Sequence, residues 1–256
     1  MIHCPAIVHP SARLAPGVQA GPGCVIGADV EVGENTWIGA YCVINGPTRI
    51  GQNNKIYQFN SIGDIPQDKK YHGEVSYLEI GDRNVIREYC TLNRGTELGG
   101  GTTRIGNDNW IMAYVHIAHD CEVGSGTTMA NGATLAGHVR VDDFATFGAF
   151  TVVHQFCSIG AYSFSAMGSV ILKDVPPFVM VAGNSASPRG LNTEGLRRKG
   201  FPPEVIQTLR RAYKTLYKKG YSLEQATQHL RAMVAECEQV AEIVAFLEHS
   251  RRGIVR

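Results

Sequence analysis

The chain has 256 residues, of which 44% are hydrophobic, and its formal net charge is +1 at pH 7. These values are typical of a globular protein with one large domain or two unequal ones. No apolar run approaches the roughly 18 residues of a membrane span, so no transmembrane segment is expected. The first residues lack the basic and apolar regions of a signal peptide, which predicts a cytoplasmic location. The near-neutral net charge gives no indication of a nucleic-acid partner.

The charge is divided unevenly along the chain. Residues 1–188 hold 11 Lys and Arg against 16 Asp and Glu, whereas residues 189–256 hold 13 against 7. A basic segment can attract an acidic partner, but it can equally be the solvated face of surface helices. On charge alone both interpretations stay open.

A six-residue repeat covers most of the chain. Its first block runs from Val8 to the hexad at Ile62, three more hexads start at Ile80, and the last block runs from Ile105 to the hexad at Ile171. The 25 hexads mostly open on an aliphatic residue, often continue with glycine, and carry a small residue in fifth place.

This pattern predicts a parallel β-helix. An aliphatic residue and a small one point inward from each hexad, three hexads form one triangular coil, and the coils stack at a strand spacing of roughly 4.8 Å. The sequence therefore predicts about eight coils.

The cysteines fit the same frame. Five of the seven occupy the fifth, inward position of a hexad, namely Cys24, Cys42, Cys90, Cys121 and Cys157. We expect them to be small buried hydrophobic residues, and neither a disulfide framework nor a metal cluster.

Two segments interrupt the repeat. Residues 64–77, "DIPQDKKYHGEVSY", are polar and out of register, so a loop should protrude between coils there. Residues 98–104, "LGGGTTR", fill one hexad with one residue too many and predict a glycine-rich bulge. No helical pattern and no Lys-Ser/Thr pair follow this bulge, which argues against a phosphate-binding loop.

The hexads end at Pro176-Pro177. A connector follows, and after it the sequence has a pattern typical of α-helices. The sequence thus predicts a β-helix over residues 1–188 and a small basic α-helical domain over residues 189–256. In the latter, a helix should run from Pro203 to Lys219. Ser222 and Gln225 resemble a capping box for the next helix, and residues 240–250 read as a third.

Three histidines share one side of the predicted prism. His119, His138 and His154 are each three hexads apart, which is one full coil, and none takes an inward position. His116 ends the preceding hexad, just around the corner from His119. Four histidines that converge on one edge indicate a functional site.

These histidines could bind a metal or transfer protons. Carbonic-anhydrase-like hexapeptide enzymes use histidines five apart on one coil, whereas His116 and His119 are three apart. Asp120 directly follows His119 and can orient its ring. Zinc ligation at this spacing stays open, but a general base with an orienting carboxylate is the better interpretation.

Several motifs resemble one known family. "HIAHDC", "NGATLAGHVRVDDFA", "VHQFCSIGA", "DVPPFV", "GNSASP", "GLNTEGLRRKGF" and the terminal "RGIVR" are similar to the UDP-N-acetylglucosamine 3-O-acyltransferases, which take the first step of lipid A synthesis. The resemblance covers essentially the whole chain. It implies a left-handed β-helix and a homotrimer with clefts between subunits. It also implies that acyl carrier protein delivers an (R)-3-hydroxyacyl group and could dock on the basic tail. No cofactor or metal is implied.

The resemblance also implies roles for individual residues. His119 would be the base, Asp120 would orient it, and the N–H of Gly137 would form the oxyanion hole. The residues that would hold the substrates are His116, His138, His154 and Gln155 at the sugar and phosphates, Asn192, Glu194 and Arg198 at the nucleotide, and Gln67, Asp68 and Lys70 from the protruding loop, near a neighbouring subunit's cleft.

The sequence departs from the family pattern at three positions. Met167 stands where some members have glycine, at a position that acts as a ruler for the length of the acyl chain. The bulkier methionine predicts a short acyl chain of about ten carbons. Alternatively, the Met167 side chain merely packs between coils. Asn93 replaces a histidine that many relatives have, which leaves open whether the acceptor carries a 3-hydroxyl or a 3-amino group. Lys199 occupies a position that is often a second arginine.

Other functions remain as alternatives. The N-acyltransferase of the same pathway has an additional N-terminal domain, whereas here the hexads begin by residue 8. An acetyl-CoA-dependent hexapeptide transferase would leave "GLRRKGF" and the helical tail unexplained. A metal-dependent carbonic-anhydrase-like enzyme and a non-catalytic β-helix that serves as a binding scaffold complete the set.

Overall fold

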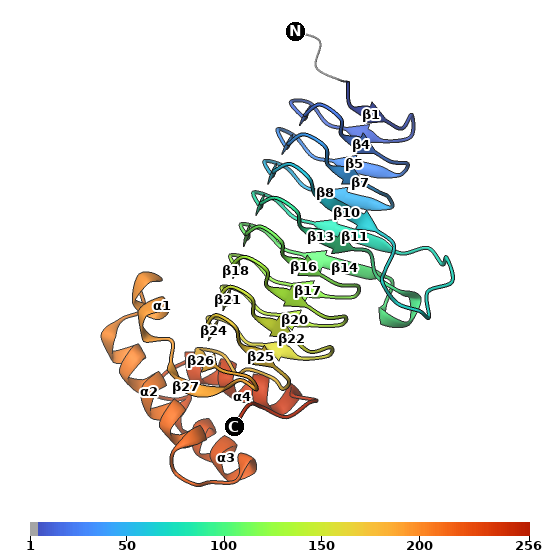
Figure 1. Ribbon diagram of the computed structural model, residues 1–256. Coiled ribbons are helices and arrows are strands. Elements are labelled where there is room, and N and C mark those ends of the chain that lie inside the picture. The colour runs from blue at the N-terminus through green and yellow to red at the C-terminus, as the bar shows by residue number, and fades with distance from the viewer. Residues whose placement is uncertain (1–4) are drawn as a thin grey trace.

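The computed structural model describes residues 5–256 and contains a left-handed parallel β-helix that ends in a helical unit (Figure 1). The prism has three faces, each a parallel sheet whose successive strands come from successive coils. The predicted fold class is confirmed. The signal-peptide argument rests partly on residues 1–4, which lie outside the described part.

We call the three faces sheets A, B and C. Sheet A contains β1 (Ile7–Val8), β4 (Val25–Ile26), β7 (Val43–Ile44), β10 (Ser61–Asp64), β13 (Thr91–Asn93), β16 (His116–Ile117), β19 (Thr134–Leu135), β22 (Val152–Val153) and β25 (Val170–Ile171). Sheet B contains β2 (Arg13–Leu14), β5 (Val30–Val32), β8 (Thr48–Ile50), β11 (Tyr77–Ile80), β14 (Thr102–Ile105), β17 (Glu122–Val123), β20 (Arg140–Val141) and β23 (Ser158–Ile159). Sheet C contains β3 (Gln19–Ala20), β6 (Trp37–Ile38), β9 (Lys55–Ile56), β12 (Val85–Ile86), β15 (Trp110–Ile111), β18 (Thr128–Met129), β21 (Thr146–Phe147), β24 (Phe164–Ser165), β26 (Val179–Ala182) and β27 (Ser187–Leu191).

The core of the prism is a set of columns parallel to its axis. From Ile26 onward, the aliphatic residues at the first hexad position point inward and are buried, and so are the five cysteines, as predicted. The B–C corner, where the chain turns from sheet B to sheet C, carries a buried polar column instead: Thr36, Asn54, Asn84, Asn109 and Thr127. The side-chain amides in this column bond backbone groups of the next coil, so no buried amide is left unpaired there.

Both interruptions of the repeat lie at the A–B corner, where the chain turns from sheet A to sheet B. The loop of residues 65–76 leaves after β10 and returns at β11, and it protrudes from the side of the prism (Figure 1). The glycine-rich bulge contains a 3₁₀ turn, η1 (Glu97–Gly99), capped by Thr96 and followed by β14.

The sheets continue beyond the predicted end of the repeat at Pro177. β26 pairs in parallel with β24, and β27 folds back against it in antiparallel register. The hexad pattern does end at the prolines, but the predicted connector contains two strands, and β26 stacks on the last coil although its sequence has left the hexad pattern. Residue 188, the predicted domain boundary, lies inside β27.

Four helices follow: α1 (Thr193–Arg198), α2 (Pro203–Tyr217), α3 (Leu223–Met233) and α4 (Gln239–His249). α2 begins at the predicted Pro203 but ends two residues before Lys219. The Ser222–Gln225 capping box is confirmed. The apolar faces of α2, α3 and α4 form a second core. No helix within residues 5–256 is long and apolar enough to cross a membrane.

Candidate active site

The predicted histidine strip lies at the A–B corner. Residues 18 apart occupy equivalent positions on successive coils, so Asp120, His138 and Phe156 form one column, with left-handed φ angles of 59°, 60° and 65°. His119 and Gly137 are equivalent in the neighbouring column. The N–H of His138 donates to the carbonyl of His119 at 3.0 Å and ties the two coils together.

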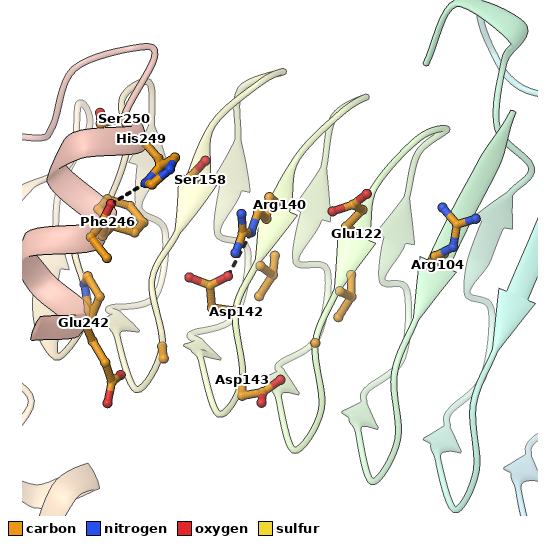
Figure 2. Close-up of a pocket in the computed structure, with 16 residues that line it drawn as sticks. Arg104, Glu122, Arg140, Asp142, Asp143, Ser158, Glu242, Phe246, His249 and Ser250 are labelled. Carbon is orange, nitrogen blue, oxygen red and sulfur yellow. Dashed lines mark hydrogen bonds and ion pairs between the residues drawn. The ribbon is translucent and has the colours of Figure 1, made fainter. Parts of the chain in front are cut away.

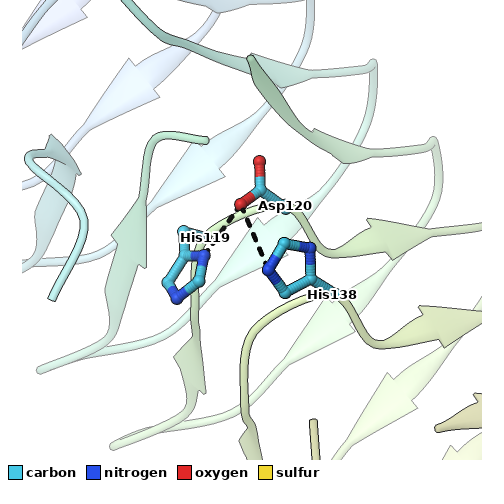
Figure 3. Close-up of side chains that lie close together, drawn as sticks. All are labelled: His119, Asp120 and His138. Atoms are coloured by element: carbon cyan, nitrogen blue, oxygen red, sulfur yellow. Dashed lines mark hydrogen bonds and ion pairs between the residues drawn. The ribbon is translucent and has the colours of Figure 1, made fainter. Parts of the chain in front are cut away.

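His119 and Asp120 form a hydrogen-bonded pair (Figure 3). Nδ1 of His119 lies 2.8 Å from Oδ2 of Asp120, whose side chain is fully buried, while 13% of the His119 side chain is exposed. An ionised carboxylate can only accept, so Nδ1 carries the proton and Nε2 remains free for chemistry.

Gly137 lies directly against the His119 ring. A Cβ atom on residue 137 would lie 2.7 Å from Nε2 and 2.6 Å from Cε1 of His119, so only glycine leaves room for the imidazole. Within residues 5–256 the N–H of Gly137 donates no hydrogen bond. A free backbone donor thus lies beside the free nitrogen of a histidine, which is an arrangement that acyl transfer can use.

The charge of Asp120 is stabilised by several donors. Burial raises the pKa of this carboxyl, but hydrogen bonds from His119 and from the hydroxyl and amide of Thr96 outweigh burial, so the pKa lies below its ordinary value. His138, whose Nε2 lies 3.7 Å from Oδ2 of Asp120, adds a smaller attraction. The pair therefore contains an ionised acid next to a histidine.

His138 and His116 flank the pair. Burial lowers the pKa of His138, and the nearby His119 lowers it further, against the opposing attraction of Asp120 and Asp68. Burial also lowers the pKa of His116, again with a contribution from His119. Both flanking rings are therefore favoured in the neutral form, in which one ring nitrogen donates a hydrogen bond and the other accepts one.

Each flanking ring has a partner that the sequence argument did not identify. Phe156 stacks on His138 with ring centroids 4.5 Å apart. The hydroxyl of Thr91 lies 2.7 Å from Nδ1 of His116. The 18-residue period could have predicted Phe156, because it lies one coil beyond His138, and β13 lies directly beside β16, which explains Thr91.

The same cluster has to be considered as a metal site. Ligand atoms of His119, Asp120 and His138 lie within 4.8 Å of one another. However, both oxygens of Asp120 already accept hydrogen bonds, from His119 and twice from Thr96. A cation at this point would displace some of them, whereas proton transfer at Nε2 leaves all of them intact. The geometry favours proton transfer.

His154 and Gln155 lie at the edge of this cluster. Both are exposed, and Nδ1 of His154 lies 3.1 Å from the carbonyl of Gln155 in its own turn. Phe156, and neither of these two residues, makes the contact with His138. The structure therefore brings His116, His119 and His138 together and leaves His154 exposed on the next coil.

The protruding loop bends toward the same corner. Asp68 is close enough to attract the His138 ring of its own chain, and it holds the loop backbone by accepting from the N–H of Lys70. Gln67 and Lys70 are exposed. At the root of the loop, the buried Asn93 donates to the carbonyl of Ile65 at 2.8 Å. Asn93, the residue that departs from the family pattern, therefore anchors the loop.

The predicted nucleotide-binding residues lie at a different corner. The Asn192 side chain caps α1, and its amide donates to the carbonyl of Tyr162, which is on the B–C corner. Glu194 pairs with Arg197 at 2.5 Å. Arg198 is exposed, and within residues 5–256 it makes no ion pair. These side chains are not brought to the histidine cluster of their own chain.

Lys199 and Met167 also lie away from the cluster. The Lys199 ammonium lies 4.4 Å from the ring centroid of Phe144, a cation–π contact at the B–C corner. Met167 lies at the C–A corner, where the chain turns from sheet C to sheet A, and 73% of its surface is exposed. It therefore does not pack between coils of its own chain.

A separate groove of about 990 Å³ runs between sheet B and α4 (Figure 2). Its lining mixes apolar and charged residues, and the charged ones include Arg104, Glu122, Arg140, Asp142 and Glu242. None of the predicted catalytic or substrate-binding residues lines it. The candidate active site is thus a corner of the prism and lies outside this groove.

The sequence profiles of two protein families match parts of the chain. The profile described as "Udp N-acetylglucosamine O-acyltransferase; Domain 2" matches residues 174–255. The profile "Bacterial transferase hexapeptide (six repeats)" matches residues 29–64 and 102–137.

Curated proteins and solved structures are similar over nearly the full length. Acyl-[acyl-carrier-protein]–UDP-N-acetylglucosamine O-acyltransferase from Thiobacillus denitrificans is 54% identical, over 100% of this chain and 99% of its own. Its counterpart from Alkalilimnicola ehrlichii is 56% identical, over 98% and 97%. The structure of the Francisella novicida UDP-N-acetylglucosamine acyltransferase superposes with a TM-score of 0.97 at 45% identity, over 100% and 94% of the two chains. The chain therefore belongs to the acyl-[acyl-carrier-protein]–UDP-N-acetylglucosamine O-acyltransferase family and is an acyltransferase.

Proposed function

We propose that this protein transfers an (R)-3-hydroxyacyl group from acyl carrier protein to the 3-position of UDP-N-acetylglucosamine, the first step of lipid A synthesis, with His119 as general base. The observation that carries the proposal is the His119–Asp120 pair, whose free Nε2 lies against Gly137. No part of the reaction requires a cofactor or a metal.

The chemistry follows from these three residues. Nε2 of His119 takes the proton of the sugar 3-hydroxyl while that oxygen attacks the thioester carbonyl, and the buried Asp120 carboxylate stabilises the imidazolium that forms. The negative charge on the tetrahedral intermediate is stabilised by the N–H of Gly137. When the intermediate collapses, the carbon–sulfur bond breaks, and the proton on His119 passes to the leaving sulfur.

The flanking histidines suit sugar and phosphate binding. His116 and His138 are neutral rings whose remaining nitrogens can donate to or accept from hydroxyl groups. His154 and Gln155 are exposed on the next coil and could reach a more distant part of the substrate. From the loop, Asp68 and its exposed neighbours Gln67 and Lys70 approach the same corner.

A ring of three chains would unite the remaining site residues. Sheet B carries a row of alternating charges, from Arg13 to Arg140, whereas sheets A and C carry exposed apolar side chains such as Val43, Trp37 and Trp110. If sheet A of one copy packs against sheet C of the next, closed threefold symmetry buries the apolar faces and leaves the charged sheet in water.

In this ring, the A–B corner of one copy meets the B–C corner of its neighbour. The His119 pair would then face the neighbour's Asn192, Glu194 and Arg198, and the exposed guanidinium of Arg198 is suited to a nucleotide phosphate. Met167, at the C–A corner, would lie deeper in the same cleft, where an acyl chain could end. We therefore propose a homotrimer with clefts between subunits.

The test of the base is a transfer assay with hydroxyacyl-acyl carrier protein and UDP-N-acetylglucosamine. His119→Ala should lose activity on the order of 10²–10⁴-fold. The control is His229→Ala, because His229 is an exposed residue of α3. Full activity of His119→Ala would contradict the proposal and favour a binding scaffold, and stoichiometric zinc in the active protein would favour the metal-dependent alternative.

Donor and acceptor are tested together. Acyl carrier proteins of graded chain length are paired with UDP-N-acetylglucosamine and with its 3-amino analogue. We expect O-acylation of the 3-hydroxyl with a donor of about ten carbons. A clear preference for the 3-amino analogue would instead associate Asn93 with a change of acceptor.

A further inference from the structure

The glycine-rich bulge encloses the carboxylate of Asp120. The N–H of Thr96 donates to Oδ1 at 2.8 Å, and the hydroxyl of Thr96 donates to Oδ2 at 2.7 Å. From the other side of the bulge, the hydroxyl of Thr103 accepts the N–H of Asp120 at 2.8 Å. One insertion in the repeat therefore holds both the side chain and the backbone of the residue that orients His119.

The glycines of the bulge permit this close approach. A Cβ atom on Gly99 would lie 2.0 Å from Cγ of Asp120, and one on Gly95 would lie 2.8 Å from its Oδ1. Neither glycine has the left-handed backbone that by itself would require glycine. At residue 99 only glycine leaves room for the carboxylate, which is fully buried.

We propose that Thr96 is a positioning residue for acyl transfer: its hydroxyl and amide hold the Asp120 carboxylate so that Oδ2 fixes His119 with Nδ1 inward and Nε2 toward Gly137. This inference rests on the proposed function of His119. Thr96 and His119 donate to the same oxygen, so the threonine hydroxyl also limits how much of the carboxylate charge acts on the imidazole.

The side chains around this oxygen determine what a substitution does. Besides His119 and Asp120, the titratable groups that face the pair are His116 on β16, His138 on the next coil and Asp68 of the protruding loop. None of these hydrogen-bonds the carboxylate as Thr96 does, since the His138 nitrogen lies 3.7 Å away. Removal of the Thr96 hydroxyl therefore leaves His119 as the one remaining side chain within 3 Å of Oδ2 among the described residues.

Thr96→Val tests the proposal, with Thr96→Ser as the variant that keeps the hydroxyl. With one donor fewer, the carboxylate interacts more strongly with the imidazolium form of His119, so a higher pH is needed to free the base. We expect kcat to fall about tenfold, KM for the nucleotide sugar to stay unchanged, and the acidic limb of the kcat/KM profile to move up by roughly half a pH unit. Thr96→Ser should restore all three values.

The controls separate positioning from stability. Thr36→Val removes an equally buried threonine hydroxyl at the B–C corner, far from the site, and should lower thermal stability without moving the pH profile. Gly99→Ala should lower kcat through its clash with Asp120, whereas Gly190→Ala, with open space around it, should not. If Thr96→Val fails to fold, Thr96→Ala takes its place.

The outcomes distinguish this inference from the proposed function. An unchanged pH profile and kcat in the folded Thr96→Val protein, with His119→Ala inactive, would overturn the role of Thr96 alone. Full activity of His119→Ala would overturn the base on which the inference depends. A lowered kcat that Thr96→Ser fails to rescue would also count against positioning by the hydroxyl.

Discussion

At the scale of single residues, the surroundings of each histidine decide what it can do. His119 has a buried carboxylate on one nitrogen and an open position at the other. Within residues 5–256, the side chain of the exposed His154 makes one hydrogen bond, to a backbone carbonyl of its own turn. Both lie on the same edge of the prism, and the position of the edge alone does not separate them. Hydrogen bonding of the carboxylate by Thr96 distinguishes the base from its neighbours.

Titration of His116 should make the free energy of unfolding depend on pH. Burial lowers the pKa of His116 in the folded protein below the ordinary histidine value near 6.5. Above pH 6.5, His116 therefore makes its full contribution to the free energy of unfolding. This contribution is lost as the pH falls below 6.5 toward the pKa of the folded protein. His116→Gln should therefore flatten the decline in unfolding free energy as the pH falls below about 6.5. Denaturant titrations at several pH values measure the slope.

His229→Gln is the matched control for this measurement, because His229 is exposed on α3. It should leave the slope unchanged. A His116→Gln protein with the full wild-type slope would assign the acid sensitivity to the other histidine with a lowered pKa, His138.

Met167 should set the length of the acyl chain. Its exposed thioether would occupy the end of the proposed cleft, and glycine at this position would lengthen the slot by several carbons. Met167→Gly should shift the preferred donor from about ten toward about fourteen carbons, with kcat/KM for the longer donor rising on the order of a hundredfold, since four more CH₂ groups would be buried and each contributes about 0.8 kcal/mol. Competition between donors of two lengths measures the shift, and unchanged selectivity would refute the ruler.

At the scale of elements, insertions at one corner contribute the groups that the regular coils do not. The regular turns at the A–B corner supply His119, Gly137 and His138, one coil after another. The bulge adds Thr96 to this set, and the loop of residues 65–76 adds Asp68. Both insertions leave from the same corner, so the periodic coils can keep their stacking while the site gains irregular contacts.

The polar column inside the B–C corner should contribute strongly to stability. Asn84 bonds two backbone groups of the next coil: its side-chain amide donates to the carbonyl of Gly106, and its side-chain oxygen accepts from the N–H of Asn109. Asn84→Ala leaves both buried groups unpaired and should lower the free energy of unfolding by about 3 kcal/mol. Denaturation at a fixed protein concentration measures the change.

The exposed Asn131 provides the comparison for this column. Asn131→Ala should stay within about 0.5 kcal/mol of the wild type. Equal effects of the two substitutions would mean that the column contributes nothing beyond ordinary surface amides.

At the scale of the whole molecule, one chain carries the parts of the proposed site on three different corners. His119, the proposed base, lies at the A–B corner, the residues around α1 lie at the B–C corner, and Met167 lies at the C–A corner. A row of stacked, exposed aromatic rings also follows the C–A corner: Tyr41, Phe59, Tyr89 and Tyr114. A monomer would leave these rings in water, which favours their burial against other copies.

Charge within this row should therefore disrupt assembly. Tyr89→Asp places a carboxylate in the middle of the stack and should convert the proposed trimer to smaller species with at least a tenfold loss of activity, because the proposed cleft would be incomplete. Sedimentation measures the mass. Glu122→Ala, on the charged sheet B, is the control and should remain trimeric. A trimeric and active Tyr89→Asp protein would contradict this assembly.

The sequence by itself determined the architecture and the edge on which the proposed catalytic residues lie. Because each coil repeats after 18 residues, the hexads fix which side chains point inward, bury the five cysteines, and align His119 with Gly137 and Asp120 with His138. Only the tertiary structure decided the rest. Thr96 reaches Asp120 through a bulge that breaks the period, and β26 stacks on the prism without a hexad pattern. Hydrogen bonds across such irregular segments depend on the three-dimensional path of the chain and leave no period in the sequence.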